Sequence, residues 1–127
     1  MIYTFNYDTH YDPAMPNVDI TIVKPGTRQE RVVTAIVDSG ADATFIPEQL
    51  LKQLNIPQTG WVSARGVAGF SYRVPTYIVS LRIQELSLGF VRVGGDQHSD
   101  HMILGRDVLN QFIITLNGLA NVVELSD

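Results

Sequence analysis

Short apolar stretches, many of them alternating with polar residues, run through most of this chain and are separated by Gly, Pro and Asn. This pattern is typical of β-strands, and we expect strands at 18–23, 31–37, 73–83, 86–93, 112–116 and 119–125. Turns are expected at 24–27, near Gln84 and at Asn117-Gly118, because Asn-Gly between two apolar runs favours a hairpin. The pattern therefore predicts an all-β domain.

Two segments have helical rather than strand spacing. Residues 47–54 place Leu50, Leu51 and Leu54 on one face and begin with Pro47, whose missing N–H is tolerated at a helix start. Residues 106–112 predict one or two further turns. Both segments are too short to be stable alone, so we expect one or two short helices packed on the strands.

Composition narrows the class of protein. The 127 residues are 45% apolar and contain 9 Lys or Arg against 13 Asp or Glu, a net charge of −4. We expect one compact domain over 1–127, since no repeat or linker interrupts it. No basic run indicates a nucleic-acid or anionic-membrane partner.

The sequence also bears on the location of the protein and on cysteine chemistry. No apolar run approaches the ~20 residues of a membrane-spanning helix, and the first residues do not resemble a signal peptide, so the expected location is the cytoplasm. The sequence has no cysteine, which excludes a disulfide scaffold, a thiolate metal site and a cysteine nucleophile.

The segment 35–47 is the first candidate for chemistry. An apolar run ends at Asp38, Ser39 supplies a hydroxyl, and Gly40 permits a tight turn. This arrangement holds a carboxylate at the end of a strand, although an ordinary Asx turn would have the same residues.

A second segment, 102–109, strengthens the functional interpretation. It combines an apolar run with Gly105 and Arg106, the latter at the start of a predicted helix. Together with Asp38-Ser39-Gly40 upstream and a glycine-containing hairpin between, it resembles the retropepsin-like aspartic proteases over about 18–116. The helical segment 47–54 and Ser39, where viral proteins usually have Thr, make it more similar to bacterial and cellular members than to viral ones.

The resemblance implies roles for the first motif. Asp38 matches the catalytic aspartate, Ser39 the hydroxyl residue that locks two active-site turns together, and Gly40 a glycine that binds substrate backbone. Ala41 matches a small residue beside the substrate. Asp42 matches a second acid that caps the bound peptide and pairs with the arginine of the second motif.

The resemblance also implies substrate contacts elsewhere. Gly66, Val67, Ala68 and Gly69 match the tip of a flap hairpin over the site. Pocket walls are expected from Phe45 and Ile103, structural support from Gly105 and Arg106, and a charge-sensitive border of the cleft from Asp100 with His101.

The implied fold is a closed β-barrel of about six strands, and the implied reaction needs two carboxylates. The chain has one Asp-Ser-Gly, so a C2 homodimer would bring two Asp38 side chains together to cut a peptide or protein substrate. No metal or organic cofactor is implied. The alternatives are a catalytically silent dimerisation or peptide-binding module and a dormant monomer. The chain ends form the interface in retroviral proteases, and here they are longer.

Two further sets of residues have alternative interpretations. His98, Asp100 and His101 have spacing compatible with zinc, but a solvated polar loop explains the same residues. Trp61 and Tyr72, near the base of the expected flap, either line pockets or pack within the hairpin.

Overall fold

The computed structural model describes residues 1–66 and 68–127. Its elements are mostly strands with two short helices among the described residues. In chain order they are β1 (Ile2–Asn6), β2 (Asn17–Val23), β3 (Glu30–Val37), β4 (Phe45–Pro47), α1 (Glu48–Gln53), β5 (Gln58–Arg65), β6 (Ser71–Ile83), β7 (Leu86–Asp96), β8 (Met102–Leu104), α2 (Arg106–Leu109), β9 (Ile113–Asn117) and β10 (Val122–Ser126).

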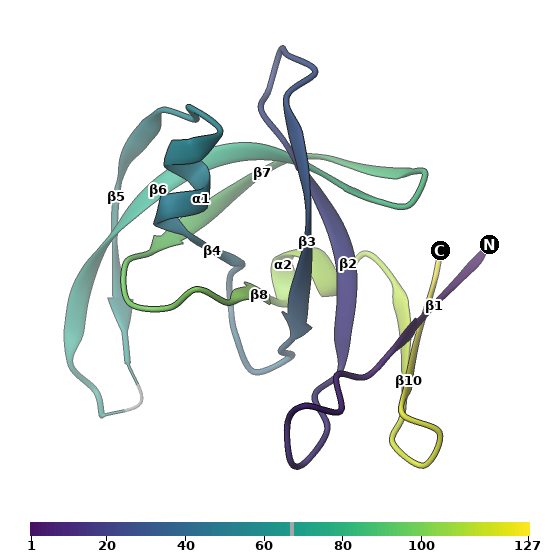
Figure 1. Cartoon of the computed structure of the whole chain (residues 1–127). Helices are drawn as coiled ribbons and strands as arrows, with labels where there is room; N and C mark the ends of the chain where they lie inside the picture. Colours follow the sequence, from purple (N-terminus) through teal and green to yellow (C-terminus); the bar gives the residue numbers. More distant parts are fainter. Residues whose placement is uncertain (67) are drawn as a thin grey trace.

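Six strands close into a barrel. They follow the order β2-β3-β8-β4-β7-β6, and β6 pairs back onto β2, while β5 extends the sheet beyond β6 (Figure 1). Closure pairs both edges of the six-strand sheet, which removes the exposed edges of an open sheet. The prediction of an all-β closed barrel of about six strands with one or two short helices is confirmed.

Apolar side chains that alternate along the strands fill the interior of the barrel. Val18, Ile20 and Ile22 of β2 are almost completely buried, and so are Val79 and Leu81 of β6. Side chains that are two residues apart lie on the same face of a strand, so these positions form one apolar surface. The period-two pattern in the sequence therefore identified the core faces of β2 and β6.

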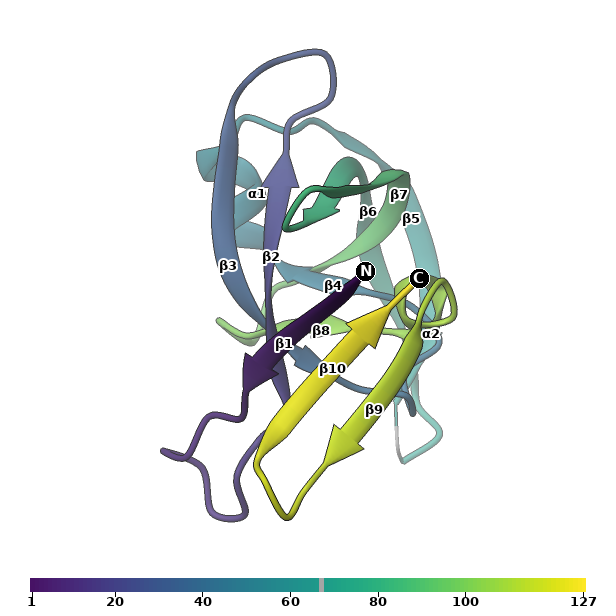
Figure 2. The same ribbon diagram turned by 90° about the vertical axis from the view of Figure 1, so that its right-hand side faces the viewer.

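A second, three-stranded antiparallel sheet lies beside the barrel, with the order β1-β10-β9 (Figure 2). Phe5, Val123 and Leu125 of this sheet are buried in the same apolar core as the barrel. The two chain ends meet there, where the Met1 ammonium lies 2.8 Å from Asp127 Oδ1.

The observed elements differ from the expected ones in several places. The strands β1, β4 and β5 were not predicted because their sequences lack clear alternation or are very short. The strand β10 begins at Val122 and not at 119, since the turn extends over 118–121 and Asn121 has φ of 55°. The helix α2 ends at Leu109, three residues before the predicted end.

Within the described ranges, no helix has the length and apolar character needed to cross a membrane.

Candidate active site

The short strand β8 brings the two sequence motifs together. It runs parallel to β3, with Val37 beside Leu104, and its other edge pairs with β4 through Ile103 and Phe45. Parallel strands end at the same edge of a sheet. The residues that follow β3 therefore lie next to those that follow β8, and the Asp38 N–H donates to the Leu104 carbonyl over 3.1 Å.

Asp38 begins a tight turn at this edge. Its side-chain Oδ1 accepts a hydrogen bond from the Gly40 N–H at 2.9 Å, and its carbonyl accepts one from the Ala41 N–H at 3.1 Å. Asp38 is half-buried, whereas Ser39 and Gly40 are exposed. The turn thus fixes one carboxylate oxygen and leaves the site open on one side.

Arg106 ties this turn to the second motif. Its Nη1 donates to the Ser39 carbonyl at 2.8 Å, its Nη2 donates to Asp42 Oδ1, and its backbone N–H donates to the Ala41 carbonyl at 2.9 Å. A planar guanidinium can make these contacts together because its donors have a fixed fork geometry. Arg106 supports the turn and is not itself placed as an acid or base.

A buried hydrogen-bond network lies beneath the turn. Thr44 is fully buried; its Oγ1 donates to Asp107 Oδ1 at 2.7 Å and accepts from the Gly105 N–H at 3.1 Å. Asp107, in the first turn of α2, also accepts the Val108 N–H at 2.9 Å. Thr44 could not be found from the sequence, because its partners lie more than sixty residues away and only the pairing of β4 with β8 brings them together.

Gly105 allows the two motifs to approach closely. A Cβ at this position would lie 2.4 Å from the backbone carbonyl carbon and oxygen of Ala43. Because that distance is far inside van der Waals contact, only glycine fits here. The structural support expected of Gly105 is therefore steric.

Phe45 and Ile103 face each other across the β4–β8 pair, and both are half-buried. The Phe45 ring covers Gly94, where a Cβ would lie 2.7 Å from the ring. On its other side Ile103 pairs with Ile36 of β3, two residues before Asp38.

The strands β5 and β6 form a long antiparallel hairpin. The Gly66 N–H donates to the Phe70 carbonyl at 3.0 Å, and Gly69 has φ of 82°. Ala68 and Gly69 are exposed at its end, and Val67, also expected there, lies outside the described residues. Figures 1 and 2 both show the hairpin extending past the barrel toward the lower side of the view, the side on which β3 ends.

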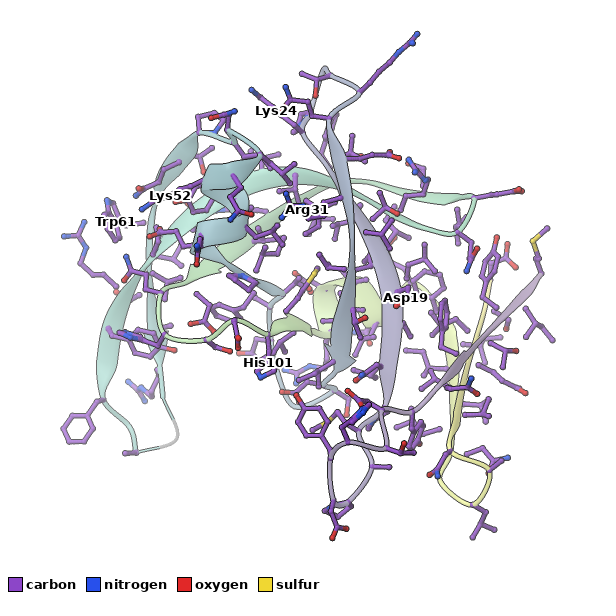
Figure 3. All side chains as sticks on the ribbon, in the orientation of Figure 1. Asp19, Lys24, Arg31, Lys52, Trp61 and His101 are labelled. Atoms are coloured by element: carbon purple, nitrogen blue, oxygen red, sulfur yellow. The ribbon has the colours of Figure 1, made fainter. Side chains whose placement is uncertain are left out.

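The register of this hairpin separates Trp61 from Tyr72. Val62 pairs with Val74 and Ala64 with Tyr72, so these four share the face on which Val74 is buried. Trp61 is on the opposite face, where the Arg73 guanidinium lies 4.6 Å from its ring centroid, and Figure 3 shows it on the outer side of β5. Tyr72 and Trp61 are therefore on opposite faces of the hairpin, and Tyr72 shares the face of Val74, which with the Phe45 ring surrounds Gly94.

The polar loop before β8 carries Asp100 and His101. His101 Nε2 lies 3.5 Å from Asp100 Oδ1, and its Nδ1 lies 3.4 Å from the hydroxyl of Tyr11, which comes from the loop between β1 and β2 (Figure 3). Sequence reasoning missed Tyr11, because it lies in the most irregular stretch of the chain. No group of three or more possible metal ligands occurs among the described residues.

A groove of about 600 Å³ lies between α1 and this loop, and its lining includes Glu48, Lys52 and His98 but not Asp38. At its wall, Tyr77 donates to Glu48 Oε2 at 2.8 Å. Burial by itself would raise the pKa of Glu48, but hydrogen bonds from Tyr77, Gln97 and Lys52 and the Lys52 charge hold it below 4.5. Burial and the bond to Glu48 raise the pKa of Tyr77 to about 12. The Glu48 carboxylate and the Tyr77 hydroxyl thus have hydrogen-bond partners within the fold, which indicates a structural role for both.

The sequence over residues 25–111 matches the family model of gag-polyprotein putative aspartyl proteases. No curated protein sequence matches this chain.

Solved structures share the fold. A retropepsin-like aspartic protease from Rickettsia conorii has a TM-score of 0.66 at 12% identity, over 98% of this chain and 91% of that chain. The retroviral protease-like domain of Ddi1 from Leishmania major has a TM-score of 0.56 at 20% identity, over 89% of each chain. EIAV protease complexed with the inhibitor HBY-793 has a TM-score of 0.57 at 18% identity, over 76% of this chain and 86% of that chain.

Proposed function

Because this chain belongs to the family of gag-polyprotein putative aspartyl proteases, we propose that it is an aspartic endopeptidase. Its two catalytic carboxylates would be the Asp38 side chains of two copies in a homodimer. The observation that carries this proposal is the Asp38 turn, where Gly40 fixes one carboxylate oxygen at 2.9 Å and Arg106 holds both sides of the turn.

The stoichiometry follows from the chemistry. Hydrolysis of a peptide bond by carboxylates needs one ionised group as base and one protonated group as acid. Two carboxylates in hydrogen-bonding range share one proton, because two like charges so close together are strongly disfavoured. One chain supplies a single Asp-Ser-Gly, so a second copy supplies the other carboxylate.

The reaction uses a water held between the two Asp38 carboxylates. The ionised carboxylate takes a proton from the water while the water oxygen attacks the scissile carbonyl carbon. The protonated carboxyl group stabilises the oxyanion that forms. A proton then passes to the leaving nitrogen, and the C–N bond breaks. The two carboxylates titrate as a pair, so the pH profile of the rate belongs to the dimer.

The surroundings of Asp38 support an extended, mainly apolar substrate. Gly40 is exposed beside the carboxylate, and Phe45 and Ile103, which are half-buried and paired across β4 and β8, supply apolar surface for the peptide. The β5–β6 hairpin acts as the flap, which excludes water and contacts the peptide backbone. Tyr72 is its side chain on the substrate side.

The test is cleavage of a diverse peptide library between about pH 3 and 7, read by mass spectrometry. Wild type is compared with Asp38→Asn and with the matched control Asp19→Asn, which changes an exposed aspartate on β2. We expect wild type and Asp19→Asn to cut at the same positions, and Asp38→Asn to lose at least about a thousandfold in rate. Equal cutting by Asp38→Asn, or no cutting by wild type at any pH, would contradict the proposal.

A further inference from the structure

We propose that a pocket formed by β1, β2 and the loop 7–16 between them binds a guanidinium group on an aliphatic stem, as in an arginine side chain. Its volume is about 390 Å³, and its lining includes Phe5, Asp8, Asn17 and Asp19 but no residue of the turn that Asp38 begins. Figures 1 and 2 show the loop at the lower end of both strands. The proposal goes beyond the proposed protease function, since it does not use Asp38.

The carrying observation is the side chain of Asn17, the first residue of β2. Asn17 is only 7% exposed, and its Oδ1 has no hydrogen-bond partner. Among the described residues, no other buried side-chain nitrogen or oxygen lacks a partner. Such atoms are rare, because an unpaired polar group that is removed from water destabilises the fold. A hydrogen-bond donor bound in the pocket supplies the partner that the fold does not.

The Asn17 amide can reach such a donor. Asn17 and Asp19 are two residues apart on β2, so their side chains lie on one face of the strand, opposite the almost completely buried Val18. The Asn17 oxygen is shielded from water, but the χ2 torsion of asparagine has a broad distribution. A rotation of the amide about this torsion therefore turns its oxygen toward the pocket at little cost.

The charged groups of the pocket favour a cation. Asp8 Oδ1 accepts the His10 N–H and lies 2.9 Å from His10 Nδ1, and these hydrogen bonds hold the pKa of Asp8 below 3.8. Asp19 Oδ1 accepts the Thr34 hydroxyl at 3.1 Å and adds a second negative charge. Within the described part of the chain, no Lys or Arg lines the pocket and neither Oδ2 atom has a hydrogen-bond partner.

The shape of the site selects guanidinium among cations. A metal ion needs several ligands around one point, and no three or more His, Asp or Glu side chains gather in this way among the described residues. An ammonium group is a compact point charge. A guanidinium is planar, carries donors on several sides and packs on aromatic rings. It can therefore donate to Asn17 and Asp8 together while it lies beside Phe5.

The direct test is a titration of the protein with N-acetyl-L-arginine amide, followed through backbone amide signals by NMR. We expect the shifts to centre on the pocket, and the neutral isostere N-acetyl-L-citrulline amide to bind at least tenfold more weakly. No shift with the arginine amide, shifts centred on the Asp38 turn, or equal binding of the citrulline amide would overturn the proposal.

A further titration identifies the source of the guanidinium group. Free L-arginine carries an α-carboxylate, which the two aspartates of the pocket repel, whereas the arginine amide resembles a residue within a polypeptide. Weaker binding of free L-arginine would support the proposal with an arginine side chain of another protein as the ligand. Equal or tighter binding would support it with the free amino acid as the ligand.

A matched pair of charge variants tests the pocket. Asp8→Asn removes one charge and keeps an oxygen that can accept the His10 N–H. Asp12→Asn makes the same change at an exposed position of the same loop that does not line the pocket. We expect Asp8→Asn to bind the arginine amide at least tenfold more weakly than wild type and Asp12→Asn to bind it equally. Equal affinities of the two variants would overturn the site.

Asn17→Leu separates ligand binding from a structural role. Leucine is similar in size and removes the unpaired amide oxygen. We expect binding of the arginine amide to fall at least fivefold, while the midpoint of thermal denaturation stays the same or rises. Unchanged binding, or a markedly lower midpoint, would overturn the role given to Asn17.

The pocket and the protease site can fail separately. Asp38→Asn should bind the arginine amide as wild type does, although it cuts no peptide. Loss of binding in Asp38→Asn would overturn the pocket, because the ligand would then lie at the active site. Binding by a wild type that cuts no peptide would contradict the protease function alone.

Discussion

At the scale of single residues, the candidate site depends on hydrogen bonds between segments far apart in sequence. Arg106 reaches Ser39 and Asp42, and Thr44 reaches Gly105 and Asp107. The side chains of Arg106 and Asp42 are partly exposed, whereas Thr44 is fully buried. Loss of a buried partner is costly, because the group left behind has no water to replace it.

Thr44→Val should therefore destabilise the fold. Valine keeps the shape but removes the hydroxyl, which leaves the buried Gly105 N–H without its acceptor at 3.1 Å. We expect a loss of about 1–3 kcal/mol in the free energy of unfolding, measured by urea denaturation. The control Thr34→Val, an exposed strand position on β3, should change it by less than about 0.5 kcal/mol. Similar effects of both variants would refute this role for Thr44.

The loop residues Asp100 and His101 are predicted to affect substrate choice. Tyr11 lies 3.4 Å from His101 Nδ1 and so helps to orient the ring beside Asp100. We expect Asp100→Ala to change the preference of the enzyme for charged residues in a peptide library, and Tyr11→Phe to change it in part. The measurement is the cleavage-site profile at one pH; an unchanged profile in Asp100→Ala would count against the hypothesis.

At the scale of elements, the site depends on β8 lying between β3 and β4. This arrangement places Gly105 against the backbone of Ala43, where no side chain fits. The steric constraint belongs to the packing of strands and not to the local conformation, since Gly105 has an ordinary extended backbone with φ of −91°.

Gly105→Ala should consequently be severely destabilising. The added methyl would lie 2.4 Å from Ala43 backbone atoms, so the two motifs would have to separate. We expect a loss of about 3 kcal/mol or more, together with loss of activity. Gly118→Ala is the control, because no atom lies within 4 Å of a Cβ there. Thermal denaturation of the two variants decides the matter; a Gly105→Ala protein as stable as Gly118→Ala would contradict it.

The contact between α1 and β6 predicts a pH dependence of stability. The pKa of Tyr77 is raised from 10 to about 12 in the fold, so the folded state favours the neutral phenol. The contribution of Tyr77 is fully present below pH 10 and is lost as the pH rises toward 12. For Glu48, whose folded pKa lies below 4.5, the contribution is present above that value and is lost on acidification.

Tyr77→Phe tests this at the alkaline end. We expect the variant to be less stable than wild type at pH 7, since Glu48 Oε2 loses its donor, and the difference to shrink between pH 10 and 12. Tyr72→Phe, an exposed tyrosine, should show neither effect. Urea denaturation across this range measures it, and a constant difference between Tyr77→Phe and wild type would disprove the assignment.

At the scale of the whole molecule, activity should depend on enzyme concentration. A site made from two Asp38 residues exists only in the dimer, so specific activity should rise with concentration and reach a plateau. Each chain carries a charge of −4, so the two copies repel each other. Added salt screens this repulsion and should lower the enzyme concentration at which specific activity is half its plateau value. Activity assays over a dilution series give the result. Specific activity that stays constant down to concentrations where the protein sediments as a monomer would exclude a shared site.

The local features of the chain can be read from its sequence. Period-two alternation indicated β2, short apolar runs indicated β3 and β6, and the residues around Asp38 and Gly105 indicated the two motifs and their family resemblance. These features were accessible because strand alternation and turn chemistry depend on neighbours within a few residues. The same reasoning missed β1, whose partner β10 lies at the other end of the chain, and β5, whose sequence lacks clear alternation.

Only the tertiary structure decided what these features do together. The insertion of β8 beside β3 brought Arg106 to the Asp38 turn, and the register of β5 with β6 put Tyr72 and Trp61 on opposite faces. The pairing of both chain ends in one sheet left β9 as the open edge. The first and third of these are contacts between residues distant along the chain, which follow from how the strands close around a common core and not from any local pattern.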